Sequence, residues 1–216
     1  MPVTREEFVR AYPTLFHVSL ANDADQISRH GLLSTSALLD FCEVGGSERF
    51  SIESQRRPKA VPIRHPVHGS FLINDQAPMS DVALSRCLID LSPQGWYESL
   101  NGRVFFWPTR SRLEKHLAAR LVRGKQRLVF SFDTQAFVDR FGDLVEPSPI
   151  NSGNTMRNAV PRGSKTFSTM SEYPFHERRK QDGLANAVAE VTYPYAIPQE
   201  KLSGLSKDSW SSVPVE

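Results

Sequence analysis

Short apolar runs and longer periodic segments follow one another along this chain and predict different elements. Apolar runs bounded by polar or turn residues predict strands at residues 15–20, 69–75, 103–107, 127–133 and 189–198. Apolar residues repeated every three or four positions predict helices at residues 4–12, 22–31, 34–42, 80–91, 111–124, 134–142 and 199–205. Helices separate the strands but the connections are irregular, which favours an α+β fold over a doubly wound sheet.

Capping signals predict where several of these helices begin and end. Glu7 follows Thr4 by three residues, and Glu114 follows Ser111 at the same spacing, so each pair predicts a capping box. Gly31 is the expected stop of the helix that begins near residue 22, because glycine readily adopts the backbone conformation found just past a helix end.

Three polar segments are expected to lack regular structure. Residues 43–60 predict a surface loop, residues 144–187 mainly long loops, and residues 206–216 a flexible tail. Residues 1–205 are expected to form a single domain, since a chain of 216 residues with 39% apolar side chains is large enough for one core.

Charge and cysteine content narrow the class of protein. A formal net charge of +2 makes no global case for nucleic-acid binding, so any basic surface must be local. Cys42 and Cys87 lie among leucines and are expected to be reduced core thiols, which suits a cytoplasmic protein. No apolar run approaches the roughly 20 residues of a membrane span, and the start of the chain does not resemble a signal peptide.

The first candidate for chemistry is the strand at residues 15–20, which carries His17 and Ser19 shortly before the helix that ends at Gly31. No glycine-rich dinucleotide fingerprint and no P-loop follows a predicted strand. A nucleotide bound by this chain therefore needs some other device.

Two further candidates lie on later strands. Phe105, Phe106 and Trp107 are consecutive, and since alternate side chains face opposite sides of a strand, one core cannot hold all three. At least one ring is then exposed or lines a cleft. Glu190 opens the last predicted strand, where it is either an ordinary edge charge or a carboxylate held at the mouth of a cleft.

Taken in order, three segments resemble the motifs of the ADP-ribosyltransferase fold in its histidine–tyrosine–glutamate branch. They are "LFHVS…QISRHGLL", "GRVFFWPTRSRL" and "VAEVTYPYAIP". The "HGLLS" and "APMSD" segments are similar to bacterial toxins of the DarT type, which ADP-ribosylate DNA bases. The resemblance covers residues 15–198 and implies an ADP-ribosyltransferase-like split β-sheet core with flanking helices and long loops.

The resemblance implies that NAD is the co-substrate. His17 would bind a ribose hydroxyl as a catalytic residue, the backbone of Val18 would hold the nicotinamide amide, and Ser19 would support the turn through its hydroxyl. Val18 stands where the family has glycine, which is tolerable because the contact there uses backbone groups.

The second and third motifs would complete the site. Phe105 stands at the tyrosine position and would stack on nicotinamide, with Phe106 or Trp107 as the alternative. Glu190 would bond the 2′-hydroxyl of the nicotinamide ribose. Val188 occupies the position where arginine-modifying enzymes of this fold carry Glu or Gln, so arginine is a poor acceptor candidate.

The chemistry explains why a carboxylate is needed. Breaking the bond between nicotinamide and ribose builds positive charge on the sugar, as in glycoside cleavage. A carboxylate at Glu190 stabilises that charge and then accepts the proton of the attacking group.

Basic and polar loops supply candidates for the acceptor. Residues 103–127 contain eight Lys or Arg residues and a single acidic residue, Glu114. These basic side chains form either a solvated helix face or a surface that binds the phosphates of a nucleic acid. Weaker candidates, in loops that ordinary turns explain better, are Asn74 and Gln76 for the cofactor and Asn151 and Arg162 for the acceptor. Arg178 and Arg179 lie in the predicted loop before Glu190, which the resemblance implies contacts the acceptor. Aromatic and basic residues over 173–179 favour nucleic acid, DNA or RNA, over protein.

Other functions stay open at this stage. They are an RNA 2′-phosphotransferase, a protein-directed ADP-ribosyltransferase, and a non-catalytic nucleotide- or protein-binding module of the same fold. An antitoxin or a hydrolase is an open partner for a toxin of this type, and no membrane partner is expected. His65 and His68 lack further ligands, so no metal is expected either.

Overall fold

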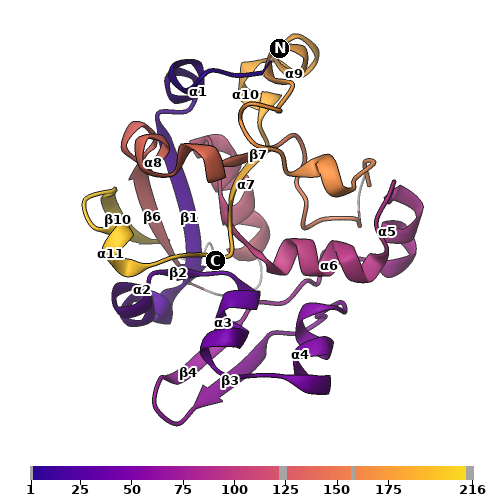
Figure 1. The fold of residues 1–216 in the computed structure, drawn as a ribbon, viewed down its shortest axis with the longest axis vertical. Helices are drawn as coiled ribbons and strands as arrows, with labels where there is room; N and C mark the ends of the chain where they lie inside the picture. The colour runs from indigo at the N-terminus through magenta and orange to yellow at the C-terminus, as the bar shows by residue number, and fades with distance from the viewer. Residues whose placement is uncertain (1, 122–125, 157–158, 213–216) are drawn as a thin grey trace.

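Two three-stranded antiparallel sheets lie at the centre of the computed structural model (Figure 1). The structure describes residues 2–121, 126–156 and 159–212. One sheet has the order β1–β6–β10, with bounds Thr14–Leu20, Arg127–Asp133 and Ser206–Ser212. The other has the order β5–β8–β7, with bounds Arg103–Phe106, Glu190–Pro194 and Glu146–Ser148. Helices surround both sheets, so the predicted α+β class is confirmed.

The remaining elements are short. The helices are α1 (Arg5–Ala11), α2 (Ala24–His30), α3 (Thr35–Phe41), α4 (Gly46–Glu53), α5 (Asp81–Cys87), α6 (Pro93–Asn101), α7 (Arg110–Leu121), α8 (Thr134–Phe141), α9 (Phe175–Asp182), α10 (Leu184–Ala187) and α11 (Gln199–Leu202). Two separate two-stranded sheets complete the fold: β2 (Leu32–Leu33) pairs with the distant β9 (Ala196–Ile197), and β3 (Val61–His65) forms a hairpin with β4 (Gly69–Ile73).

A backbone bridge joins the two central sheets. The Phe16 N–H donates to the Trp107 carbonyl (3.0 Å), and the Trp107 N–H donates to the Phe16 carbonyl (2.8 Å). Beyond this point β1 continues along β6 and β5 along β8. Residues 17–19 of β1 and 103–105 of β5, on one side of this bridge, line a cavity.

The main core explains how the strands are oriented. Val104 and Phe106 of β5 are buried, whereas Arg103 and Phe105 are partly exposed. Phe106 packs edge-on against Phe132 and Phe137, at ring-centroid distances of 5.7 and 5.1 Å. Since β5 alternates, this packing directs Phe105 to the opposite face.

Three smaller cores accompany the main one, and the first packs Phe16 and Val129 against Leu113 and Leu117 of α7. In the second, Leu39, Ile52, Ile63 and Ile73 join α3, α4 and the β3–β4 hairpin into a lobe, which lies at the bottom of Figure 1. The third packs Trp96 and neighbouring side chains of α5 and α6 against Phe167. Cys42 and Cys87 are free and buried in the second and third of these cores, as predicted.

The capping signals are partly confirmed. Thr4 and Glu7 form the predicted capping box at the start of α1. The expected box of Ser111 and Glu114 is wrong, because α7 begins at Arg110 and the Thr109 hydroxyl accepts from the Arg112 N–H (3.3 Å). The end expected for this helix beyond residue 121 lies outside the described residues.

Several segments expected to be irregular form regular structure. Residues 43–60 contain α4, whose Ile52 is buried in the lobe core. Residues 144–187 contain β7, α9 and α10 between loops. The segment 206–212, expected to be part of a flexible tail, is β10 and pairs with β6, whose backbone donors and acceptors need a neighbour. No helix in the described segments has the length and hydrophobicity needed to cross a membrane.

Gly31 sets the path of the chain out of α2. Its φ of +84° favours glycine, and a Cβ there would lie 2.1 Å from the Ile197 carbonyl oxygen. That carbonyl belongs to β9, which pairs with β2 directly after Gly31. The glycine therefore lets α2 turn tightly into β2.

We expect Gly31→Ala to lower the free energy of unfolding by at least about 2 kcal/mol, because both the backbone conformation and the contact with Ile197 oppose a Cβ. Gly183→Ala is the matched control. Its φ is +76°, but a Cβ there would have no atom within 4 Å, so we expect a loss of only about 1 kcal/mol. Chemical denaturation of both variants measures the difference, and equal losses would contradict the role of the Ile197 contact.

Candidate active site

A cavity of about 440 Å³ lies where β1, β5 and β8 approach one another. It is also lined by α7 and by the loops around residues 74–78 and 151–154. The residues predicted from the sequence that line it are His17, Val18, Ser19, Asn74, Gln76, Phe105, Trp107, Asn151 and Glu190. The size is within the range of ligand pockets in proteins.

His17 is held in one orientation by β5. Its Nδ1 lies 2.9 Å from the Phe105 carbonyl oxygen, and since a carbonyl only accepts, Nδ1 carries the hydrogen. Burial lowers the pKa of His17 to about 4 despite this hydrogen bond. The imidazole is therefore neutral near pH 7, and its Nε2 is a hydrogen-bond acceptor.

Glu190 is a buried carboxyl group with two donors on one oxygen. The N–H and the hydroxyl of Ser152 donate to Oε2, at 3.1 and 2.6 Å, and the residue is 6% exposed. Burial raises the pKa of Glu190 to about 7, although the Ser152 hydrogen bonds and the charges of Arg112 and Arg162 oppose the rise. The group thus changes protonation close to neutral pH.

Arg162 positions the loop that carries Ser152. Its guanidinium donates to the carbonyls of Ser152 (2.9 Å), Asn154 (3.2 Å) and Val160 (3.1 Å), and it lies over the ring of Trp96. The residue is 1% exposed and does not line the cavity. The expectation that Arg162 contacts the acceptor is therefore corrected: its guanidinium is used to shape the loop behind Glu190.

Two of the three consecutive aromatics reach the cavity. Phe105 lies edge-on to Phe167 (6.1 Å) and lines the cavity, as does Trp107, whose ring lies 4.1 Å from that of His116. Phe106 is fully buried in the main core and does not line it. The alternation of β5 thus removes Phe106 as an alternative to Phe105.

Arg57 fixes the loop that carries Asn74 and Gln76. Its Nε donates to the Asn74 carbonyl (3.1 Å), and its backbone N–H donates to the Gln76 side-chain oxygen (3.1 Å). The Gln76 N–H donates in return to the Arg57 carbonyl (2.6 Å), and the Asn101 side-chain oxygen accepts from the guanidinium (3.1 Å). Composition and spacing did not predict these hydrogen bonds of Arg57, because the partners come from three distant segments.

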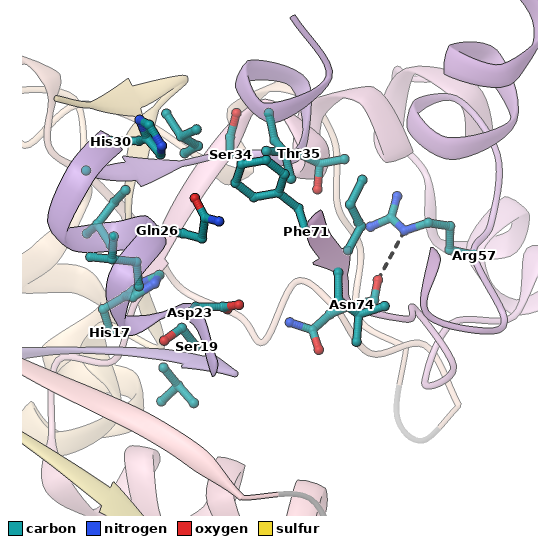
Figure 2. Close-up of a pocket in the computed structure, with 18 residues that line it drawn as sticks. His17, Ser19, Asp23, Gln26, His30, Ser34, Thr35, Arg57, Phe71 and Asn74 are labelled. Carbon is teal, nitrogen blue, oxygen red and sulfur yellow. Dashed lines mark hydrogen bonds between the residues drawn. The ribbon is translucent and has the colours of Figure 1, made fainter. Parts of the chain in front are cut away.

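A second cavity of about 210 Å³ adjoins the first. The two share His17, Val18, Ser19 and Asn74 among their lining residues. Figure 2 shows Asp23 and Gln26 reaching toward its open centre from one side and Asn74 from the other. Asp23 and Gln26 were not predicted from the sequence as site residues.

Basic side chains of α7 and β6 form one wall of the larger cavity. Arg112, Lys115 and Arg127 line it, together with His116. Arg112 and Lys115 are separated by three positions on a helix, a spacing that puts them on one face. Periodicity was therefore a usable signal for this wall, and the excess of Lys and Arg in the segment was another.

Arg178 and Arg179 do not line the cavity. They lie on α9, where Arg178 is half-buried and pairs with Asp182 at 3.9 Å, and Arg179 is exposed. His65 and His68 stack on each other at 4.4 Å in the β3–β4 hairpin. Within the described ranges no group of three or more His, Cys, Asp or Glu side chains has an arrangement that could hold a metal ion.

Comparison with known proteins assigns a family. Residues 13–202 match the model of a family of unknown function, DUF7002. This is most of the chain, so the chain belongs to that family. No curated protein and no solved structure matches it.

The raised pKa of Glu190 makes a prediction about stability. A carboxyl group whose pKa is about 7 in the folded state and 4.5 otherwise favours folding when protonated, and this contribution is lost as the pH rises through about 7. We expect Glu190→Gln to remove this pH-dependent loss of stability, because the amide does not titrate. The free energy of unfolding of the variant, relative to the parent, should increase between pH 4.5 and pH 8.

Denaturation of both proteins at a series of pH values measures this difference. Glu200→Gln is the control, because Glu200 is exposed on α11 and the variant should follow the parent at every pH. A difference between Glu190→Gln and the parent that does not change with pH would contradict the burial effect.

Proposed function

We propose that this member of the DUF7002 family is an NAD-dependent mono-ADP-ribosyltransferase that transfers ADP-ribose to a nucleic-acid base. The observation that carries the proposal is the shared cavity of His17, Phe105 and Glu190, which come from three strands far apart in the sequence. These are the residues that stand at the histidine, tyrosine and glutamate positions of the family that the sequence resembles. A split pair of antiparallel sheets joined between β1 and β5 agrees with the fold implied by that resemblance.

The first strand would bind the donor. A neutral His17 with Nε2 as acceptor suits a ribose hydroxyl, which donates. The Val18 backbone would hold the nicotinamide amide, while the Ser19 hydroxyl donates within its own strand to the Leu20 carbonyl (3.4 Å). Phe105 would stack on the nicotinamide ring, with Trp107 as the other aromatic surface of the cavity.

Glu190 would supply the electrostatic and proton-transfer steps. In the ionised form it stabilises the positive charge that develops on C1′ as the bond to nicotinamide breaks and its electron pair leaves with nicotinamide. The acceptor nitrogen then bonds to C1′, and its proton passes to the carboxylate. Ser152 holds Oε2, so the orientation of the carboxylate is fixed before the ligand binds.

The alternative RNA 2′-phosphotransferase requires arginines that are free to hold phosphate beside the histidine. Arg57 lines the same cavity as His17, but its guanidinium is already bonded to backbone carbonyls and to Asn101. Arg57 is therefore not available for phosphate, and turnover of NAD with a 2′-phosphorylated RNA alone would favour this alternative. Incubation with NAD and, separately, DNA, RNA and protein, followed by mass spectrometry, tests the proposal, and no mass increase of ADP-ribose on any of them would refute it.

We expect Glu190→Gln to lower transfer at least about a hundredfold, because the variant keeps the shape of the side chain but loses its charge and its basicity. Nicotinamide release measures the rate, and Glu200→Gln should release it as the parent does. Full activity of Glu190→Gln, with its fold verified by denaturation, would reject Glu190 as the catalytic group.

The pKa of Glu190 also predicts a pH profile. A base with a pKa of about 7 is mostly protonated at lower pH, so the rate of transfer should rise with pH up to about 7 and then level off. A profile of initial rates between pH 5 and pH 9 measures this. A rate that falls as the pH rises through 7 would assign the titrating group to an acid instead.

A further inference from the structure

The basic wall formed by Arg112 and Lys115 contains charges that the protein itself leaves available. In the described part of the chain, the guanidinium of Arg112 makes one hydrogen bond, to the Asn186 side-chain oxygen (3.1 Å), and its Nε is buried without a partner. No ion pair involves either residue among the described side chains. Both line the cavity that contains Glu190.

Arg112 is close enough to Glu190 for their charges to interact. Burial lowers the pKa of Arg112, and the charge of Glu190 is the first influence that opposes this. In the reverse direction, Arg112 lowers the pKa of Glu190. Arg112 therefore lines the same cavity as the reacting carboxyl group and, among the described side chains, forms no salt bridge to it.

Two tyrosines hold the segment that leads into β8. The Tyr12 hydroxyl donates to the Leu184 carbonyl (2.8 Å), and the Tyr173 hydroxyl donates to that of Ala187. Burial raises the pKa of both phenols, and the charges of Arg112 and Arg179 at Tyr12, and of Arg178 and Arg112 at Tyr173, oppose the rise. Charges of α7 and α9 therefore both act on these two phenols.

Glu190 is accessible only to a group that enters the cavity. With 6% of its surface exposed, it cannot be reached by a base that stays paired within a duplex. A single strand can insert one base while its backbone stays outside. Trp107 and His116, on the same wall as Arg112 and Lys115, are rings on which an inserted base stacks.

We propose that Arg112 and Lys115 bind a backbone phosphate of single-stranded nucleic acid next to the base that reacts at Glu190. This inference rests on the proposed function and adds how its acceptor is held.

Binding of a fluorescein-labelled single-stranded 20-mer, as DNA and as RNA, tests the inference by anisotropy over a range of salt concentrations. Arg112→Gln and Lys115→Gln should each weaken binding by about three- to tenfold at low salt, and each should reduce the slope of log affinity against log salt by about 0.7. Arg112→Lys keeps the charge and should keep the slope. Arg64→Gln, which removes an exposed charge from β3, should bind as the parent does.

Calorimetric titration of the same variants with NAD separates this inference from the proposed function. NAD affinity that changes by less than about twofold, with the losses above, supports the inference. Equal losses for NAD and the 20-mer would overturn it, because the anion would then be the pyrophosphate of the donor. Losses of 20-mer binding no larger than that of Arg64→Gln would overturn it too. A parent that binds the 20-mer but neither binds NAD nor releases nicotinamide would refute the transferase and leave the phosphate site.

Discussion

The contact between β1 and β5 is the constraint on which the candidate site depends. The paired backbone hydrogen bonds of Phe16 and Trp107 join the two sheets, and the next residue on β1, His17, donates from its side chain to the Phe105 carbonyl. One strand thereby orients the imidazole, and the same connection places Phe105 at the cavity. Because β5 pairs with β8, Glu190 is brought to the same place from a distant part of the chain.

Burial then sets the chemistry of that place. It makes His17 a neutral acceptor and Glu190 a carboxyl group that titrates close to pH 7. Both pKa values move in the direction that favours the neutral form, because burial removes the water that solvates the charged form. Ser152 and the nearby guanidinium groups partly restore the ionised form of Glu190. A carboxyl group balanced in this way is suited to exchange a proton during a reaction.

The sequence predicted the elements better than the surroundings of the site. Strands β1, β5, β6 and β8 follow from apolar runs, and His17, Phe105 and Glu190 lie on them, so their meeting in one cavity needed only the correct strand pairing. Arg162 and Phe106 were predicted to contact the ligand, because the sequence alone does not distinguish a buried side chain from one that lines a cavity.

The supports behind the site arise from contacts between distant segments. Arg57 meets Asn74 and Asn101, and Arg162 meets Ser152 only after folding, so no local pattern encodes these hydrogen bonds. β10 was missed for the same kind of reason: a polar segment becomes a strand because β6 offers it an edge. Local propensity is a weak guide wherever a neighbouring strand decides the outcome.

The lobe made by α3, α4 and the β3–β4 hairpin has a core of its own, yet it supplies Ser34, Thr35 and Phe71 to the walls of the cavities. Apolar substitutions at Ile52 or Ile63 act inside that lobe and leave the packing of Phe106 between the sheets untouched. The protein is thus divided into a larger part that carries the reactive groups and a smaller, separately packed lobe that supplies part of the cavity walls. Substitutions in the lobe can therefore alter which ligand fits the cavities while the reactive groups stay the same.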